Sequence, residues 1–222
     1  MGPGKPIPEM GRSLADLLAD LGDIPTWRIP LRPPPGTATE EDLIAWRRTP
    51  ERWLFELADE TLILKPPGFA QSIVAGLVGS EVQRFVQEED LGVGLAASAW
   101  YRLRKGLVRS PAFSFVSWER LPGGKVPDVE IANFIPDLVV ELPRDGHTEQ
   151  EIARKVREYF EAGVRLAWVI RYPERTAAVY HSPTDVQQVE ESGALSGCDL
   201  LPGLRVPLAS LFKPLEHPTR PK

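Results

Sequence analysis

The order of the apolar patterns constrains the fold of this chain more than any other feature. Residues 69–89 carry apolar side chains at helical spacing, and Thr148 with Glu151 forms a capping box for a second helix that Gly163 ends. Strand-like runs precede, separate and follow these two helices. Elements in this order bury their apolar faces as a central mixed sheet with a helix on each side, so the sequence predicts an α/β fold.

The predicted strands are short apolar runs, some alternating and some continuous. They span residues 53–58, 61–65, 93–103, 107–116, 135–142, 166–171, 177–180 and 185–189. Asp59 and Glu60 form the turn of the first hairpin, and residues 104–106 join the third run to the fourth. Because the connections are short, we expect the runs that begin near Leu107 and Ile135 to be neighbours in one sheet.

The first 36 residues form a predicted extension of the domain. Ser13 and the apolar positions through Leu21 predict a short amphipathic helix. The proline-rich residues 29–36 cannot form a helix interior and predict an extended linker. We therefore expect an N-terminal extension over residues 1–36, an α/β domain over residues 37–213 and a flexible tail over residues 214–222. The helix stripe suits packing on the domain or on a partner chain, and the second option predicts a homodimer.

Composition excludes several classes of protein. No apolar run is long enough to span a membrane, and the Pro- and Gly-rich start lacks the apolar core of a secretory signal. We therefore expect a cytoplasmic protein without a membrane partner. One cysteine and three dispersed histidines leave carboxylates as the ligands of any metal ion. A net charge of -5 argues against non-specific coating of nucleic acid but is compatible with a local basic cleft.

Asp137 and Glu141 mark the two ends of an apolar strand. The two-residue period of a strand places them on one face with Val139, their Cα atoms roughly 13 Å apart. Two carboxylates at that separation do not readily hold one metal ion. Glu141 is the better ligand candidate, because it lies at the carboxyl end of the strand, where a cleft would open. The alternative is structural: Asp137 caps a turn and Glu141 pairs with an arginine.

Several motifs, in sequential order, resemble one family of bacterial proteins. They are Leu107-Val108-Arg109-Ser110-Pro111, Pro136-Asp137-Leu138-Val139-Val140-Glu141, Lys155 within residues 153–159, Ala162-Gly163-Val164 and Trp168-Val169-Ile170. Over about residues 37–212 the chain resembles the Uma-type restriction endonuclease family of the PD-(D/E)XK nuclease superfamily. The resemblance implies a restriction-endonuclease-like core that hydrolyses nucleic-acid phosphodiester bonds, with DNA as the partner.

The resemblance also implies roles for individual residues. In such nucleases two carboxylates hold a divalent ion that activates a water molecule, and a lysine positions that water. Glu141 is then the metal ligand and a catalytic residue, Lys155 is the catalytic lysine, and Mg2+ or Mn2+ is the cofactor. Lys155 lies at the margin of the apolar stripe of its predicted helix, from which it can reach a cleft. The alternative is a solvated helix lysine.

The chain departs from the family pattern at the expected site. Ala112 follows Pro111 where an aspartate is expected, and a methyl group cannot coordinate Mg2+. Asp128 is a candidate replacement ligand, and Glu56 is a candidate additional acidic residue. Two hypotheses stay open: an endonuclease with weak or lost metal binding, and a catalytically inactive relative that binds nucleic acid or another protein.

A basic turn adds a hypothesis about nucleic-acid binding. Arg102, Arg104 and Lys105 surround a predicted hairpin turn near the proposed cleft, where they can contact phosphates. The alternative is a charged, solvated turn without a ligand.

Overall fold

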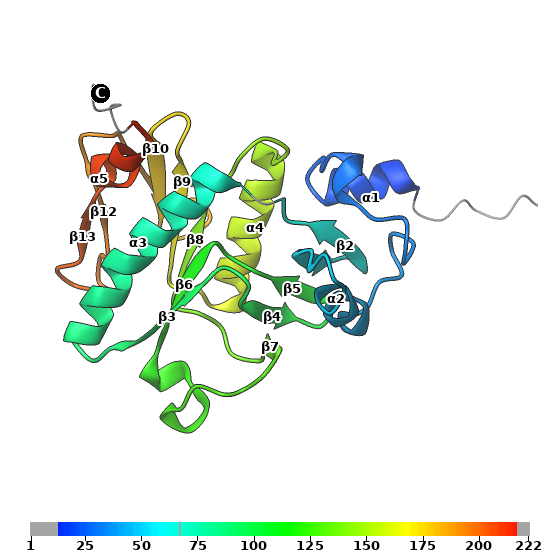
Figure 1. Ribbon diagram of the computed structural model, residues 1–222, viewed down its shortest axis with the longest axis horizontal. Coiled ribbons are helices and arrows are strands. Elements are labelled where there is room, and N and C mark those ends of the chain that lie inside the picture. Colours follow the sequence, from blue (N-terminus) through cyan, green and yellow to red (C-terminus); the bar gives the residue numbers. More distant parts are fainter. Residues whose placement is uncertain (1–12, 67, 217–222) are drawn as a thin grey trace, which may run out of the picture.

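Two β-sheets form the centre of the computed structural model, which describes residues 13–66 and 68–216 (Figure 1). The first sheet has the order β11-β10-β9-β8-β6-β3, with β3 Gly92–Ala96, β6 Phe113–Ser117, β8 Leu138–Glu141, β9 Leu166–Arg171, β10 Thr176–Tyr180 and β11 Val186–Val189. The second has the order β2-β1-β5-β4-β7, with β1 Phe55–Ala58, β2 Thr61–Leu64, β4 Trp100–Arg104, β5 Leu107–Arg109 and β7 Ile131–Ala132. A small third sheet pairs β12 Ala194–Ser196 with β13 Arg205–Pro207.

Helices lie around these sheets. The α-helices of the described residues are α1 Leu14–Asp20, α2 Glu40–Arg47, α3 Phe69–Glu88, α4 Glu149–Ala162 and α5 Leu208–Phe212. Short 3-10 helices form at η1 Thr26–Arg28, η2 Trp118–Arg120, η3 Pro122–Gly124 and η4 Lys213–Glu216. The two long helices, α3 and α4, are the two that the apolar spacing predicts.

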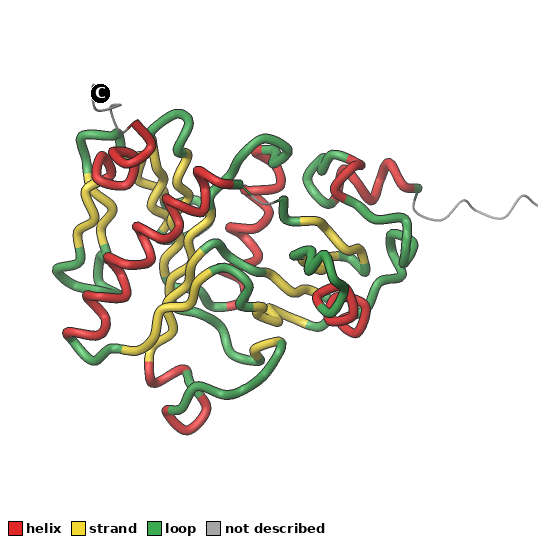
Figure 2. Tube along the Cα trace, viewed as in Figure 1, coloured by secondary structure: helices red, strands yellow, loops and turns green. Residues whose placement is uncertain are grey.

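The six-stranded sheet is mixed and is covered on both faces. β8 and β9 are parallel, whereas the other neighbouring strands of this sheet are antiparallel. On one face α3 packs through four buried valines, Val74, Val78, Val82 and Val86. On the other face α4 packs through Ile152 and Val156, and Figure 2 shows the strands in yellow between these two red helices. This arrangement confirms the predicted α/β architecture.

Two predicted strands are wrong in one respect, because each is broken and its halves belong to different sheets. The run 93–103 becomes β3 and β4, and the run 107–116 becomes β5 and β6. Ser98 adopts a φ of 91°, and Pro111 has no N–H to donate, so neither position continues a strand ladder. Leu107 therefore begins a strand of the five-stranded sheet, and only β6 pairs with β8 as expected.

The described part of the extension packs on the domain. Both hydrogen bonds of a capping box between Ser13 and Asp16 form at the start of α1. Leu17 and Leu21 then pack against apolar side chains of β1, β2 and β5. Of the two options for the helix stripe, packing on the domain is the one observed. The homodimer and the domain boundaries stay predictions.

Residues 1–12, at the start of the predicted extension, and residues 217–222, in the predicted tail, lie outside the described residues. Within the described ranges, no helix combines the length and the apolar character needed to cross a bilayer.

Candidate active site

Glu141 and Lys155, the two predicted catalytic residues, lie in direct contact. Glu141 ends β8, and the alternation along that strand turns its side chain, like that of Val139, toward α4. Lys155 Nζ lies 2.6 Å from Glu141 Oε1, and the Tyr159 hydroxyl donates a 2.6 Å hydrogen bond to the same oxygen. The structure therefore joins the strand carboxylate and the helix lysine in one site.

The geometry of α4 explains why Lys155 reaches this position. Lys155 and Tyr159 are four residues apart and so share one face of the helix. The helix begins after Thr148, whose hydroxyl accepts a hydrogen bond from Glu151 N, and ends at Gly163, which has a φ of 104°. Lys155 is only 1% exposed, so it is not a solvated helix lysine.

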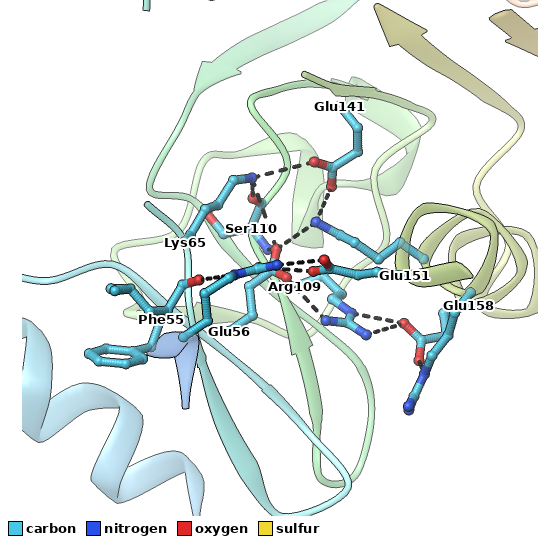
Figure 3. Close-up of polar contacts among 12 residues, drawn as sticks. Phe55, Glu56, Lys65, Arg109, Ser110, Glu141, Glu151 and Glu158 are labelled. Atoms are coloured by element: carbon cyan, nitrogen blue, oxygen red, sulfur yellow. Dashed lines mark hydrogen bonds and ion pairs between the residues drawn. The ribbon is translucent and has the colours of Figure 1, made fainter. Parts of the chain in front are cut away.

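Glu56 supplies a second carboxylate to the site (Figure 3). It lies within β1, whose four residues are all buried. Its Oε1 is 3.0 Å from Lys155 Nζ and accepts a 3.0 Å hydrogen bond from Ser110 N, and its Oε2 is 3.0 Å from Arg109 Nη1. The sequence suggests Glu56 only as an additional acidic residue. The signal that it offers is a charged residue inside an apolar strand.

Lys65 is a site residue that the sequence analysis misses. It follows β2 directly, and its ammonium lies 3.5 Å from Glu141 Oε2 and 4.0 Å from Glu56 Oε1. It also donates a hydrogen bond to the carbonyl oxygen of Ser110. A lysine just after a strand and before a proline has no local pattern that separates it from a surface lysine, so only the fold reveals it.

A second set of charges surrounds these groups. Arg109, at the end of β5, lies between Glu56 and Glu158, and its Nε donates a 2.8 Å hydrogen bond to Glu158 Oε2. Arg154 lies 2.7 Å from Glu158 Oε1 and 3.1 Å from Asp59 Oδ1. Carboxylates and cations alternate through this network, so the buried charges compensate one another.

Burial and ion pairing oppose each other at the central groups. Burial alone raises the pKa of Glu56 and Glu141, but Lys155 and other nearby cations outweigh it and hold both pKa values below the ordinary value. Burial lowers the pKa of Lys155, but Glu141 and Glu56 outweigh it and raise that pKa. At Lys65 burial prevails, and the pKa is lowered. Both carboxylates are therefore ionised at neutral pH.

Two other carboxylate candidates lie away from this site. Asp137 is at the opposite end of β8, where Arg120 Nε is 2.9 Å from its Oδ1 and Ser117 N donates a 2.9 Å hydrogen bond to its Oδ2. This is a structural role of the kind that the alternative interpretation describes. Asp128 is exposed in the loop before β7 and contacts none of the site residues in the described structure.

Ala112 brings no oxygen to the site. Its N–H donates a 2.9 Å hydrogen bond to the carbonyl of Val140, so it lies beside the strand end that carries Glu141. It is 5% exposed and packs in the apolar cluster beneath α3, whereas the Glu141 carboxylate lies on the α4 side of the sheet.

Arg102, Arg104 and Lys105 lie apart from the ion-pair cluster. The turn that carries Arg104 and Lys105 precedes β5, whereas the cluster begins at the other end of β5, at Arg109. Arg102 is held by Glu40, with Nε 2.7 Å from Oε1, while Arg104 and Lys105 are exposed. All three line a separate cavity of about 1220 Å³ with residues of α1, α2 and the linker between them. The structure therefore does not bring these three cations to Glu141.

The side chains of the site do not fit a divalent cation as they stand. Hard cations need several oxygen ligands, and the oxygens of Glu141 and Glu56 already face ammonium, guanidinium, hydroxyl or amide donors. Among the described residues, no group of three or more His, Cys, Asp and Glu side chains has the arrangement to hold a metal ion. Metal binding at Glu141 would require these pairs to open.

Comparisons with known proteins agree with the fold. The Uma2 family model, described as "Putative restriction endonuclease", matches residues 40–209. A crystal structure from Anabaena variabilis ATCC 29413, described as "a putative nuclease belonging to DUF820", has a TM-score of 0.67 and 17% sequence identity, and the similarity covers 79% of this chain and 97% of that chain. No curated protein matches the chain. Residues 13–36 lie before the region that the family model matches.

Proposed function

Because the chain belongs to the Uma2 family of restriction-endonuclease-type proteins, we propose that it is a nuclease-type domain whose metal-dependent hydrolysis of nucleic-acid phosphodiesters is strongly impaired. One observation carries the proposal. Glu141, the expected metal ligand, is 3% exposed, and its carboxylate is held by Lys155, Tyr159 and Lys65. Neither a hydrated ion nor a phosphodiester reaches it unless these partners move.

The contact between Glu141 and Lys155 supports an origin in the PD-(D/E)XK superfamily. A carboxylate at the end of a central strand and a lysine from the following helix are the pair that the resemblance implies, and they lie 2.6 Å apart. The family pattern expects its second carboxylate at position 112, which is alanine here and packs on the α3 side of the sheet, away from the Glu141 carboxylate. Mg2+ or Mn2+, the cofactor of an active relative, would keep mostly water ligands here and bind weakly.

The charged groups also lack the proton chemistry that hydrolysis needs. A general base must accept a proton from water through a free lone pair within hydrogen-bond reach. Glu141 Oε1 already accepts from Lys155 and Tyr159, and the raised pKa of Lys155 keeps that ammonium protonated. Burial, followed by the Glu141 charge, raises the pKa of Tyr159 well above its usual range, so this hydroxyl stays a neutral donor. In this arrangement Glu141 Oε1 has no lone pair left for water, and the lowered pKa makes the Glu141 carboxylate a weak base.

A cleavage assay tests the proposal. Purified protein is incubated with plasmid DNA, single-stranded DNA and RNA in Mg2+, Mn2+ or EDTA. We expect the wild type to cleave no faster than Glu141→Gln in every condition. Glu149→Gln is the matched control, because Glu149 is an exposed glutamate at the start of α4, the helix that carries Lys155. Metal-dependent cleavage that survives Glu149→Gln and disappears in Glu141→Gln overturns the proposal.

Nucleic-acid binding without cleavage is the second candidate function. Two exposed cations favour it: Arg104, which ends β4, and Lys105, on the turn that leads to β5. If this turn contacts phosphates, Arg104→Ala/Lys105→Ala weakens binding to labelled DNA about tenfold and reduces the salt slope by about two, measured by fluorescence anisotropy. Lys125→Ala/Arg157→Ala replaces two other exposed cations and is the control. Equal affinity of the two double variants contradicts binding through this turn.

A further inference from the structure

The ammonium of Lys65 lies among three oxygen atoms that come from three different segments (Figure 3). They are Oε2 of Glu141 at 3.5 Å, Oε1 of Glu56 at 4.0 Å and the carbonyl oxygen of Ser110, which accepts a hydrogen bond. The Lys65 side chain is 9% exposed, so its charge is enclosed together with these oxygens.

Oxygens of these types also hold hard divalent cations. Mg2+ and Mn2+ select carboxylate and backbone carbonyl oxygens. The Ser110 hydroxyl is a further buried oxygen, and it has no hydrogen-bond partner among the described residues. A lysine ammonium is a compact cation with three donors, so it can serve three oxygens at once. Its position among these oxygens therefore resembles that of a bound cation.

We propose that Lys65 is a built-in cation that takes the place of a divalent ion between Glu56 and Glu141. The inference rests on the proposed loss of metal-dependent hydrolysis and gives that loss a cause within the chain. Lys155 contacts both carboxylates, and Arg109 contacts Glu56 but also pairs with Glu158, so Lys155 alone does not neutralise Glu141. Lys65 supplies the remaining positive charge at Glu141, which a relative with a bound ion would take from solution.

The test removes the ammonium and offers a metal ion in its place. Lys65→Met keeps a long apolar side chain without the charge. Lys105→Met is the control, because Lys105 is exposed on the turn after β4. The melting temperatures of both variants and the wild type are measured in EDTA and in Mn2+. Isothermal titration calorimetry with Mn2+ then follows binding directly.

We expect only Lys65→Met to respond to Mn2+. In EDTA it melts about 10 °C below the wild type, because a buried carboxylate loses its partner. Mn2+ at a hundredfold excess over its dissociation constant raises the melting temperature of Lys65→Met by about 5 °C or more, since the ion binds only the folded state. The wild type and Lys105→Met keep the same melting temperature in EDTA and in Mn2+.

The two possible failures are distinguishable. A folded Lys65→Met protein that gains no stability and no heat of binding from Mn2+ overturns the role of Lys65 and leaves the proposed function standing. A wild-type protein that binds Mn2+, with that binding abolished by Glu141→Gln, overturns the proposed function and this inference with it.

A double variant keeps the inference testable where Lys65→Met does not fold. Lys65→Met/Glu141→Gln removes one negative charge together with the positive one. We therefore expect it to fold, to be more stable than Lys65→Met, and to have the same melting temperature in EDTA and in Mn2+. If this double variant also fails to fold while Glu141→Gln alone folds, Lys65 is not the counter-charge of Glu141 and the inference fails.

Discussion

Arg28 of η1 and Glu151 of α4 form a buried, two-pronged ion pair, with Nη1 2.5 Å from Oε2 and Nη2 2.9 Å from Oε1. The same guanidinium donates hydrogen bonds to the carbonyl oxygens of Gly146 and Leu64. Arg28 lies outside the region that the family model matches, whereas its three partners lie inside it. One residue of the extension thus contacts three separate segments of the domain.

These three segments also carry the ion-pair cluster. Leu64 immediately precedes Lys65, the loop that contains Gly146 follows β8 and its Glu141, and Glu151 is one helical turn before Lys155. The extension therefore holds in register the elements that bring the central charges together.

Arg28→Met should destabilise the protein by about 3 kcal/mol, because it leaves the buried carboxylate of Glu151 without its partner. Urea unfolding measures the change. Arg32→Met is the control, since Arg32 is exposed in the same extension. A loss no larger than that of the control contradicts a structural role for the pair.

Gly22→Ala should cost about 2 kcal/mol more than Gly36→Ala. Both glycines have left-handed backbone, with φ of 96° and 82°, so both substitutions carry the same kind of backbone strain. A Cβ at Gly22 would lie 2.5 Å from the backbone nitrogen of Glu151, whereas a Cβ at Gly36 meets nothing within 4 Å. Equal melting temperatures of the two variants would show that Gly22 is not in close contact with the backbone of α4.

Glu56→Gln should cost about 3 kcal/mol at pH 7 and weaken the acid sensitivity of the fold. Burial opposes ionisation of Glu56, but Lys155 and Arg109 outweigh it, so the folded-state pKa lies below the ordinary 4.5. Such a group adds stability that is fully present above pH 4.5 and is lost as the pH falls toward the lower pKa.

Urea unfolding between pH 7 and pH 3 checks this sign. The unfolding free energy of the wild type should fall more steeply below pH 4.5 than that of Glu56→Gln. Glu149→Gln is the control. Glu149 pairs with Arg171 and its side chain is 76% exposed, so this change should alter the unfolding free energy by less than about 1 kcal/mol. If the unfolding free energies of the wild type and of Glu56→Gln fall with the same slope below pH 4.5, Glu56 does not cause the acid sensitivity and the prediction is wrong.

His147 should remain neutral well below pH 6.5. Burial lowers its pKa to about 4, and the charges of Arg28 and Lys155 act in the same direction. As the pH falls, His147 of the unfolded chain is protonated near pH 6.5, whereas that of the folded chain is protonated only near pH 4. The contribution of His147 to stability is therefore full above pH 6.5 and is lost between pH 6.5 and 4. His147→Gln should show a shallower slope in that window. An NMR titration that places the pKa of His147 near 6.5 would contradict the prediction.

Local patterns determined the helices and one of the two main site candidates, Glu141. The helix predicted from Ser13 forms with both hydrogen bonds of a capping box, because side chains three residues apart meet at a helix start whatever lies around them. Glu141 is recognisable at the end of an apolar strand, since a charge beside a buried run is costly without a partner. Lys155 is implied by the family resemblance, and its place on the predicted helix is compatible with that role.

Tertiary structure decided what these residues contact. Glu56 and Lys65 come from the five-stranded sheet or its edge. No local pattern predicts that the run 107–116 breaks into β5 and β6, which is what brings this sheet next to Glu141. At α4, the Thr148 hydroxyl accepts from Glu151 N as predicted, but the Glu151 carboxylate turns to Arg28 because a buried guanidinium binds it more strongly than a helix-end amide does. Capping and periodicity act within a few residues and are legible in the sequence, whereas the pairing of buried charges depends on distant segments that only the folded chain brings together.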